Sequence, residues 1–155
     1  MIIYADTSTI GGCDDEEFKE WSLALLEEFM EGRHHLLLSD MMLQELENAR
    51  ESIRNRVIEI PHIYIVGVGI TDEAINLAET YISEGALTNK SYNDALHIAL
   101  ATLNVADVLS SWNFKHIVNL NRIRLYNSIN LRLGYHMIEI RTPREILNPK
   151  DNEKE

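Results

Sequence analysis

The stretch MIIYADTS at residues 1–8 decides the fold, because an uninterrupted apolar run ends there on an acid and two hydroxyl residues. The run at residues 2–5 is typical of a short strand buried on both faces, as in a parallel sheet. Ligands of open α/β sheets bind beyond the carboxyl ends of the strands. Asp6 directly follows the predicted strand and is therefore the first candidate functional residue.

Outward from this stretch, strand and helix patterns alternate. Further strands are predicted at residues 34–38, 62–68, 107–110 and 137–140, and helices at 16–31, from Ser39, from Thr71 to near Gly85, from Ser91 and over 119–133. Parallel strands need crossover connections, so the alternation predicts an α/β fold with a central, mostly parallel sheet and helices on both faces. We expect one domain over residues 1–148 and a short mobile acidic tail at residues 149–155.

The composition suits one globular domain with its own core. The chain has 155 residues, of which 45% are hydrophobic, and this is enough for a single hydrophobic core. No apolar run reaches the length of a membrane span, and the opening apolar segment lacks a basic leader. We therefore expect a cytoplasmic protein with no membrane partner. The one cysteine, Cys13, excludes an internal disulfide and a cysteine-rich zinc module.

Charge is unevenly distributed along the chain. The formal net charge of −11 argues against non-specific nucleic-acid binding, because phosphate contacts come from Lys and Arg. Residues 108–138, however, contain no acid and carry four basic residues that are candidates for binding RNA: Lys115, Arg122, Arg124 and Arg132. One region can therefore meet phosphate while another repels it. The alternative is an ordinary solvated helix face.

Three acids and an amide stand in different segments of the chain. Asp6 follows the first strand, Glu45 lies on the helix that begins at Ser39, Asp94 lies at the start of a later helix, and Asn113 follows another apolar run. Ionised acids that share a pocket repel one another, and a divalent cation removes that conflict. Oxygen ligands suit Mg²⁺ and Mn²⁺. The set therefore predicts an acidic pocket for a divalent metal.

Each of the three acids also has a structural interpretation. Asp94 stands at capping-box spacing from Ser91, so its side chain is placed to satisfy a backbone donor of its own helix. Glu45 fits an exposed helix acid, and Asp6 fits the cap of a turn between strand and helix. The combination of the three favours a shared site over these separate roles.

Four segments in order resemble the PIN-domain nucleases, including the VapC-type toxins of toxin–antitoxin pairs. They are Asp6-Thr7-Ser8, Glu45 within residues 39–46, Asn93-Asp94-Ala95-Leu96-His97-Ile98-Ala99, and Ser111-Trp112-Asn113-Phe114. The resemblance covers residues 1 to about 142. It implies a PIN-like three-layer α/β/α sandwich and a metal-dependent endoribonuclease that leaves a 5′-phosphate and a 3′-hydroxyl. It also implies RNA as substrate, with a cognate antitoxin and a second copy of the chain as possible partners.

The resemblance also assigns roles to residues. Asp6, Glu45 and Asp94 hold Mg²⁺ or Mn²⁺, directly or through water, and Asn113 completes the catalytic site. Ser8 and Ser111 support these ligands, although both also fit ordinary turn residues.

Asn113 departs from the pattern, because many PIN proteins have Asp there. A neutral amide binds metal more weakly than a carboxylate. The alternative function is therefore a catalytically weak PIN-like module that binds RNA or protein. A phosphohydrolase with Asp6 as nucleophile is disfavoured, because Asp6-Thr7-Ser8 lacks the second acid of that family.

Three neighbouring residues are assigned packing roles. Trp112 and Phe114 flank Asn113 and suit base stacking, but we expect core packing, with Phe114 anchoring the segment and Trp112 partly exposed. His97 lies three residues after Asp94 on the same predicted helix. We interpret it as a hydrogen-bonded core histidine.

Overall fold

A five-stranded sheet in the order β3-β2-β1-β4-β5 runs through the protein in its computed structural model, which describes residues 1–148. The strands are β1 (Ile2–Ala5), β2 (His35–Ser39), β3 (Ile65–Val68), β4 (Val108–Ser110) and β5 (Ile140–Arg141). Every pairing between neighbouring strands is parallel, which confirms the expected sheet. The expected tail at residues 149–155 lies outside the described residues.

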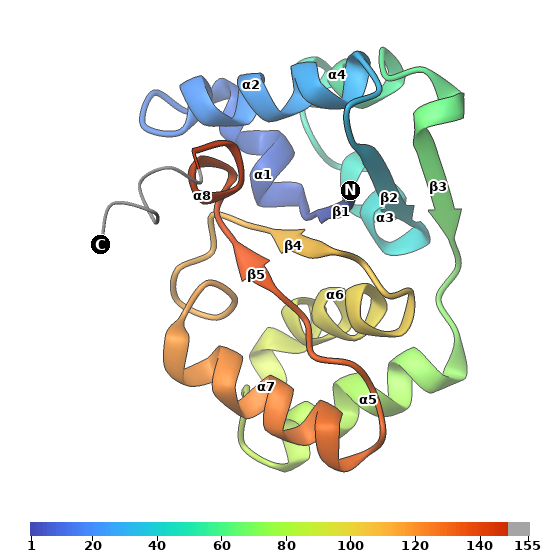
Figure 1. Cartoon of the computed structure of the whole chain (residues 1–155), viewed down its shortest axis with the longest axis vertical. Helices are drawn as coiled ribbons and strands as arrows, with labels where there is room; N and C mark the ends of the chain where they lie inside the picture. Colours follow the sequence, from blue (N-terminus) through green and yellow to red (C-terminus); the bar gives the residue numbers. More distant parts are fainter. Residues whose placement is uncertain (149–155) are drawn as a thin grey trace.

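Helices cover the sheet on both sides. They are α1 (Thr7–Gly11), α2 (Lys19–Met30), α3 (Asp40–Glu47), α4 (Glu51–Ile58), α5 (Asp72–Ser83), α6 (Tyr92–Leu103), α7 (Leu120–Arg132) and α8 (Pro143–Leu147), with short 3-10 turns η1 (Gly12–Asp14), η2 (His62–Tyr64) and η3 (Asn89–Ser91). In Figure 1, α1, α2 and α4 lie on one side of the sheet and α5, α6 and α7 on the other. This arrangement confirms the three-layer α/β/α architecture.

Within residues 1–148, no helix combines the length and apolar character that a membrane crossing requires.

Side-chain caps start the helices that follow strands. Ser39 accepts a hydrogen bond from the backbone N–H of Met42, and Thr71 accepts one from Ala74, so both predicted helix starts are confirmed. Ser91 behaves differently, because its side chain makes no cap hydrogen bond at the start of α6. The capping-box interpretation of Asp94 is therefore wrong.

Several elements differ from the prediction: β3 begins at Ile65, after η2, instead of at residue 62, and the helices α4 and α8 have no counterpart in the prediction. The strand predicted at residues 137–140 is shorter and later, because the side chain of Asn127 binds the backbone of Ile138 in place of a neighbouring strand: Oδ1 accepts from the Ile138 N–H at 2.7 Å, and Nδ2 donates to its carbonyl at 3.1 Å. The helix α1 was not predicted. Asp6 starts it by accepting from the Thr9 N–H at 3.0 Å, so its cap interpretation is confirmed.

The central position of β1 determines where polar groups meet. Ile3, Tyr4 and Ala5 are fully buried. The chain passes from β1 to β2 and β3 on one side, and then returns to place β4 on the other side of β1. Ala5 is paired with Ser110, so Asp6 and Ser111 leave the sheet side by side. This reversal of strand order is the point where open α/β sheets bind ligands.

Candidate functional site

Asp6 is held by three donors at the carboxyl ends of β1 and β4. Its Oδ1 accepts hydrogen bonds from Ser8 Oγ at 2.6 Å and from the Thr9 N–H at 3.0 Å, and its Oδ2 accepts one from Ser111 Oγ at 2.6 Å. The residue is only 4% exposed. Ser8 and Ser111, the two residues expected to support the ligands, therefore both contact the same carboxylate and fix its orientation.

Glu45 is held from two sides on α3. Its Oε1 lies 2.5 Å from His97 Nε2, and its Oε2 accepts a hydrogen bond from Thr7 Oγ1 at 2.7 Å. Burial pushes the pKa of Glu45 upward, but the hydrogen bond and charge of His97 and the hydrogen bond of Thr7 outweigh burial and hold the pKa below its ordinary value. Glu45 is therefore ionised at neutral pH.

His97 belongs to a buried chain of hydrogen bonds that runs from the start of α3 to Glu45. The N–H of Met42 donates to Ser39 Oγ at 3.2 Å, Ser39 Oγ lies 2.8 Å from the Tyr4 hydroxyl, and that hydroxyl lies 2.6 Å from His97 Nδ1. Either hydroxyl can donate between Ser39 and Tyr4, and Nδ1 can accept from Tyr4 or donate to it. The direction is fixed at the other end of the chain: an ionised carboxylate only accepts, so His97 Nε2 carries a proton and donates it to Glu45.

The same chain explains the burial of its members. His97 is 3% exposed, and Tyr4 is fully buried. Burial raises the pKa of Tyr4 far above its ordinary value, so the phenol stays protonated and remains a donor. The interpretation of His97 as a hydrogen-bonded core histidine is confirmed, and its partner is one of the candidate metal ligands.

Asp94 contrasts with the other two acids. It is partly buried in the first turn of α6, and within residues 1–148 it has no hydrogen-bond or ion-pair partner. Burial raises its pKa; His116 and His97 oppose this rise, and the charges of Asp6 and Glu45 add to it. The three carboxylates therefore lie within electrostatic range of one another, and only Asp94 has both oxygens free.

Asn113 follows Ser111 after β4 and uses its side chain in a turn. Its Oδ1 accepts from the N–H of His116 at 3.0 Å, and its own N–H donates to Ser111 Oγ at 2.9 Å. An amide oxygen has a second lone pair, so this hydrogen bond leaves room for one further donor or cation.

The donor set suits a hard cation, although the side chains are not gathered around one. Among residues 1–148, no group of three or more His, Cys, Asp or Glu side chains is placed to hold a metal ion. The oxygens of Asp6 and Glu45 instead accept hydrogen bonds from the protein. Carboxylate and amide oxygens are nevertheless the ligands that Mg²⁺ and Mn²⁺ prefer, and the unpartnered Asp94 is the group that a cation would satisfy.

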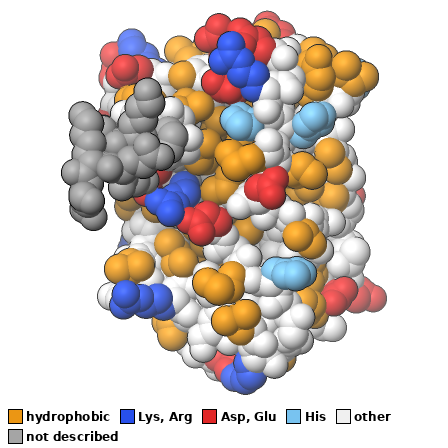
Figure 2. Space-filling view, in the orientation of Figure 1, with side chains coloured by type: hydrophobic (Ala, Val, Ile, Leu, Met, Phe, Trp, Pro, Cys, Tyr) orange, Lys and Arg blue, Asp and Glu red, His pale blue; other side chains and the backbone are white. Residues whose placement is uncertain are grey.

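The four basic residues differ in whether they bond to other groups of the protein. Arg122 donates to the carbonyl of Ala86 at 2.6 Å, and Arg132 forms an ion pair with Glu84. Lys115 and Arg124 are exposed, and neither has an ion-pair partner within residues 1–148. In Figure 2, acidic side chains lie at the top of the molecule beside basic ones, and further acidic side chains lie near its middle and at its lower right.

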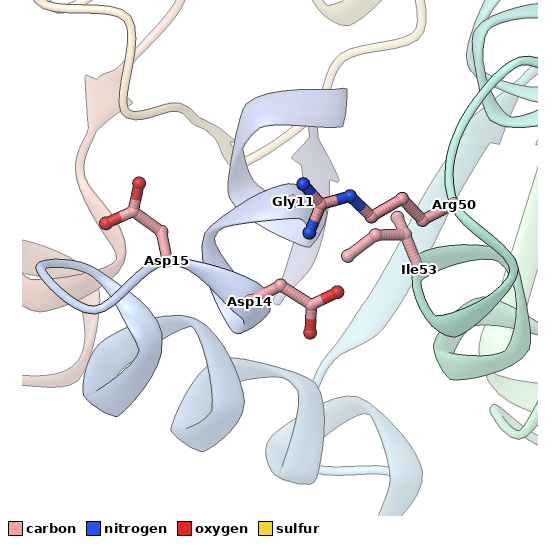
Figure 3. A pocket seen from close by; sticks show the side chains of 5 residues that line it. All are labelled: Gly11, Asp14, Asp15, Arg50 and Ile53. Carbon is pink, nitrogen blue, oxygen red and sulfur yellow. The ribbon is translucent and has the colours of Figure 1, made fainter.

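A separate hollow of about 260 Å³ lies between η1 and the start of α4. It is lined by Gly11, Asp14, Asp15, Arg50 and Ile53, and Arg50 reaches across it from the α4 side (Figure 3). None of the candidate metal ligands lines this hollow, so it is not part of the candidate site.

Comparison with solved structures defines the fold class. The chain is similar to VapC20 of Mycobacterium tuberculosis, a Sarcin-Ricin loop cleaving toxin, with a TM-score of 0.55 and 15% identity over 74% of this chain and 92% of that chain. It is also similar to VapBC2 from Rickettsia felis bound to a DNA fragment from their promoter, with a TM-score of 0.54 and 14% identity over 92% and 98% of the two chains. The fold is that of the PIN-domain VapC toxins.

Compared by sequence, the chain matches no protein-family model and no curated protein. The structural likeness therefore defines the fold, and the chemistry must be argued from the site.

Two supporting residues could not be identified from sequence. Tyr4 contacts His97 across 93 positions of the chain, and nothing in either local pattern indicates that contact. Thr7 lies in the opening motif, where nothing in the local pattern assigns it a role, although its hydroxyl donates to Glu45.

Proposed function

We propose that this protein is a metal-dependent endoribonuclease that hydrolyses RNA phosphodiester bonds. The observation that carries the proposal is Asp94, a partly buried carboxylate with no partner within residues 1–148 and a raised pKa, close to two acids that the protein holds with hydrogen bonds. A partly buried, unpaired acid with a shifted pKa at the ligand-binding edge of a sheet is typical of a functional site. The fold of the VapC toxins supports the same conclusion.

In this proposal Asp6, Glu45, Asp94 and Asn113 hold Mg²⁺ or Mn²⁺. A bound divalent ion supplies an acidified water and offsets negative charge on the phosphate. Ser8 and Ser111 keep the Asp6 oxygens in place through their hydroxyl donors. His97 does the same for Glu45. The catalytic unit is a single domain over residues 1–148.

RNA is the proposed substrate, and its phosphates are met first by Lys115 and Arg124. Their exposure and lack of ion pairs within residues 1–148 support this role, whereas Arg122 and Arg132 contribute positive charge while also bonding to the protein. Substituting Lys115 or Arg124 by Ala is expected to reduce the slope of log affinity against log salt by about one each. An unchanged slope would remove these residues from the RNA surface.

We further propose that the protein has a small antitoxin as a partner and pairs with a second copy of itself. The VapBC2 structure, a complex bound to promoter DNA, supports the antitoxin. Co-purification with the product of an adjacent small gene and measurement of the mass in solution test the two partners separately.

Cleavage of a pool of structured cellular RNAs tests the proposed activity. The native protein and Asp94→Asn are compared with Mn²⁺, with Mg²⁺ and with a chelator. Products that need metal and disappear in the variant support the nuclease. A folded native protein that gives no product with either ion contradicts it.

The alternative is a catalytically weak PIN-like module that binds RNA or protein. The observation in its favour is Asn113, whose side-chain oxygen already accepts from the His116 N–H. Calorimetric titration with Mn²⁺ separates the two functions. A saturable site that is lost in Asp94→Asn supports the enzyme, and the absence of any site supports the module.

A further inference from the structure

Of the two aromatic residues beside Asn113, Phe114 is not placed as expected. We expect it to anchor the segment in the core, but it is 52% exposed. Trp112 is partly exposed, as expected. An exposed ring next to a candidate ligand costs the protein hydrophobic burial, so this position invites a functional explanation.

The exposed ring of Phe114 is one of several aromatic rings that line a hollow of about 370 Å³. Phe18 and Trp112 are stacked, with ring centroids 4.3 Å apart and planes 16° apart. Phe114 lies 6.3 Å from each of them. Trp21 completes the aromatic lining, and the guanidinium of Arg144 lies 5.8 Å from its ring centroid.

Hydrogen bonds of Trp112 connect the lining of this hollow to the candidate site. The N–H of Trp112 donates to Ser8 Oγ at 2.9 Å, and the same hydroxyl donates to Asp6 at 2.6 Å. On the other side, Trp112 Nε1 donates to Ser22 Oγ at 2.8 Å. Gly12 makes room for the indole, because a Cβ at Gly12 would lie 2.8 Å from Nε1. The ring is therefore fixed in orientation relative to the Asp6 carboxylate.

We propose that this hollow binds a nucleobase of the RNA strand, next to the bond that is cleaved. The inference rests on the proposed function, because it takes the phosphodiester to lie at Asp6 and Asp94. A flat exposed ring stacks on any base, since every base has a π-face. Besides the rings, the hollow is lined by Thr142, Arg144, Glu17 and Glu145, whose polar groups suit hydrogen bonds with the edge of a base. Lys115, which directly follows Phe114 in the chain, is exposed. An apolar peptide would use the rings but not these polar groups.

Binding of RNA in the presence of chelator tests the inference without cleavage. Trp21 and Trp112 are the two tryptophans of the chain and both line the hollow, so quenching of intrinsic fluorescence reports on this place. The probes are oligoadenylate, an abasic oligomer of equal length and charge, and a leucine-rich amphipathic peptide. Affinities come from the anisotropy of labelled probes.

The variants separate the flat ring from its apolar bulk. Phe114→Leu is expected to weaken oligoadenylate binding about 5- to 150-fold, because a base loses its stacking partner. Phe114→Trp is expected to retain it. Leu131→Ala is the control, since Leu131 on α7 has a similar exposure of 57%, and its binding is expected to match the native protein.

Several results overturn the inference. Oligoadenylate binding that survives Phe114→Leu, or an abasic oligomer that binds as tightly as oligoadenylate, would show that no base is stacked. Saturable quenching by the peptide and none by RNA would identify a protein-docking surface instead. Base binding without cleavage under any metal would support the base site in this hollow but contradict the proposed function and the place of the site beside a cleaved bond. Cleavage without base binding would support the proposed function and overturn this inference.

Discussion

Asp6 and Glu45 sit where the protein supplies hydrogen-bond donors, whereas Asp94 sits where it supplies none. Asp6 follows β1 and Glu45 lies on α3. Hydroxyl, imidazole and backbone donors bind the oxygens of these two acids. Asp94 lies in the first turn of α6, where Ser91 makes no side-chain cap. The difference shows that the fold has already oriented two acids and left the third for a ligand from outside.

The pKa values of Glu45 and Asp94 shift in opposite directions for the same reason. Donors hold the pKa of Glu45 below its ordinary value despite burial, while burial raises the pKa of Asp94. The ionised form is therefore stabilised at one position and destabilised at the other. A cation at Asp94 would remove the second effect, so the comparison predicts unequal consequences when each residue is changed.

The largest expected effect is on cleavage. Asp94→Asn removes the one acid of the candidate site whose oxygens are both free within residues 1–148, and the rate of RNA cleavage in Mn²⁺ is expected to fall by at least about 100-fold, more than the usual loss from a supporting residue. The exposed neighbour Asn93 provides the control, because Asn93→Ala leaves the acid in place. Equal activity in native protein and Asp94→Asn would show that the bare carboxylate has no catalytic role.

The next effect concerns how Glu45 is held. His97→Leu removes the donor to Oε1, and Mn²⁺ affinity and cleavage are expected to fall about 10- to 100-fold. His97→Gln is expected to recover most of both, because its side-chain amide can donate to the same oxygen. Calorimetry with Mn²⁺ measures the affinity. Equal losses in the Leu and Gln variants would mean that packing, not orientation of Glu45, accounts for the effect.

Substitutions of Asp6 and of Asp94 should change the free energy of unfolding by different amounts. In chelator, Asp6→Asn is expected to lower the free energy of unfolding by about 1–3 kcal/mol, because one oxygen becomes a donor in a buried place that offers only donors. Asp94→Asn breaks no hydrogen bond, so no comparable loss is expected. Urea unfolding of both variants makes the comparison, and equal losses would contradict it.

The smallest effect is a dependence on pH. The folded-state pKa of Asp94 is raised, so the free energy of unfolding of the metal-free protein loses a contribution as pH rises from the ordinary carboxyl pKa toward the raised value. Asp94→Asn lacks that loss and is expected to be more stable at pH 7, by on the order of 0.5 kcal/mol. Urea titrations at pH 7 and near pH 4 measure the gain.

That gain should shrink toward pH 4, where Asp94 is increasingly protonated in both states. Glu45→Gln is the opposite control, because the lowered pKa of Glu45 stabilises the fold above the ordinary carboxyl pKa and loses this as pH falls. If the stability gain of Asp94→Asn grew at low pH, the pKa of Asp94 would not be raised in the folded protein.

Local patterns predicted much of the fold because they depend on neighbours in the chain. The apolar run at residues 2–5 became β1, and Ser39 and Thr71 started helices as expected. The prediction failed where a distant side chain intervened. Asn127 binds the backbone of Ile138 and delays β5, and no pattern at residues 137–140 contains that information.

The candidate site shows the same division. The residue types suited to a divalent cation were visible in the chain, and so was the position of Asp6 after a strand. The exposure of Phe114 was not visible, because an aromatic residue in an apolar segment looks the same whether it faces the core or solvent.

By itself, the sequence determined the alternation of strands and helices, the helix starts and the supply of acidic ligands, because each of these follows from side chains within a few residues of one another. Only the tertiary structure decided that β4 lies beside β1, that Tyr4 and His97 orient Glu45, and that Asp94 is left without a partner in residues 1–148. These outcomes depend on contacts between segments far apart in the chain, and burial then sets which charges are stabilised.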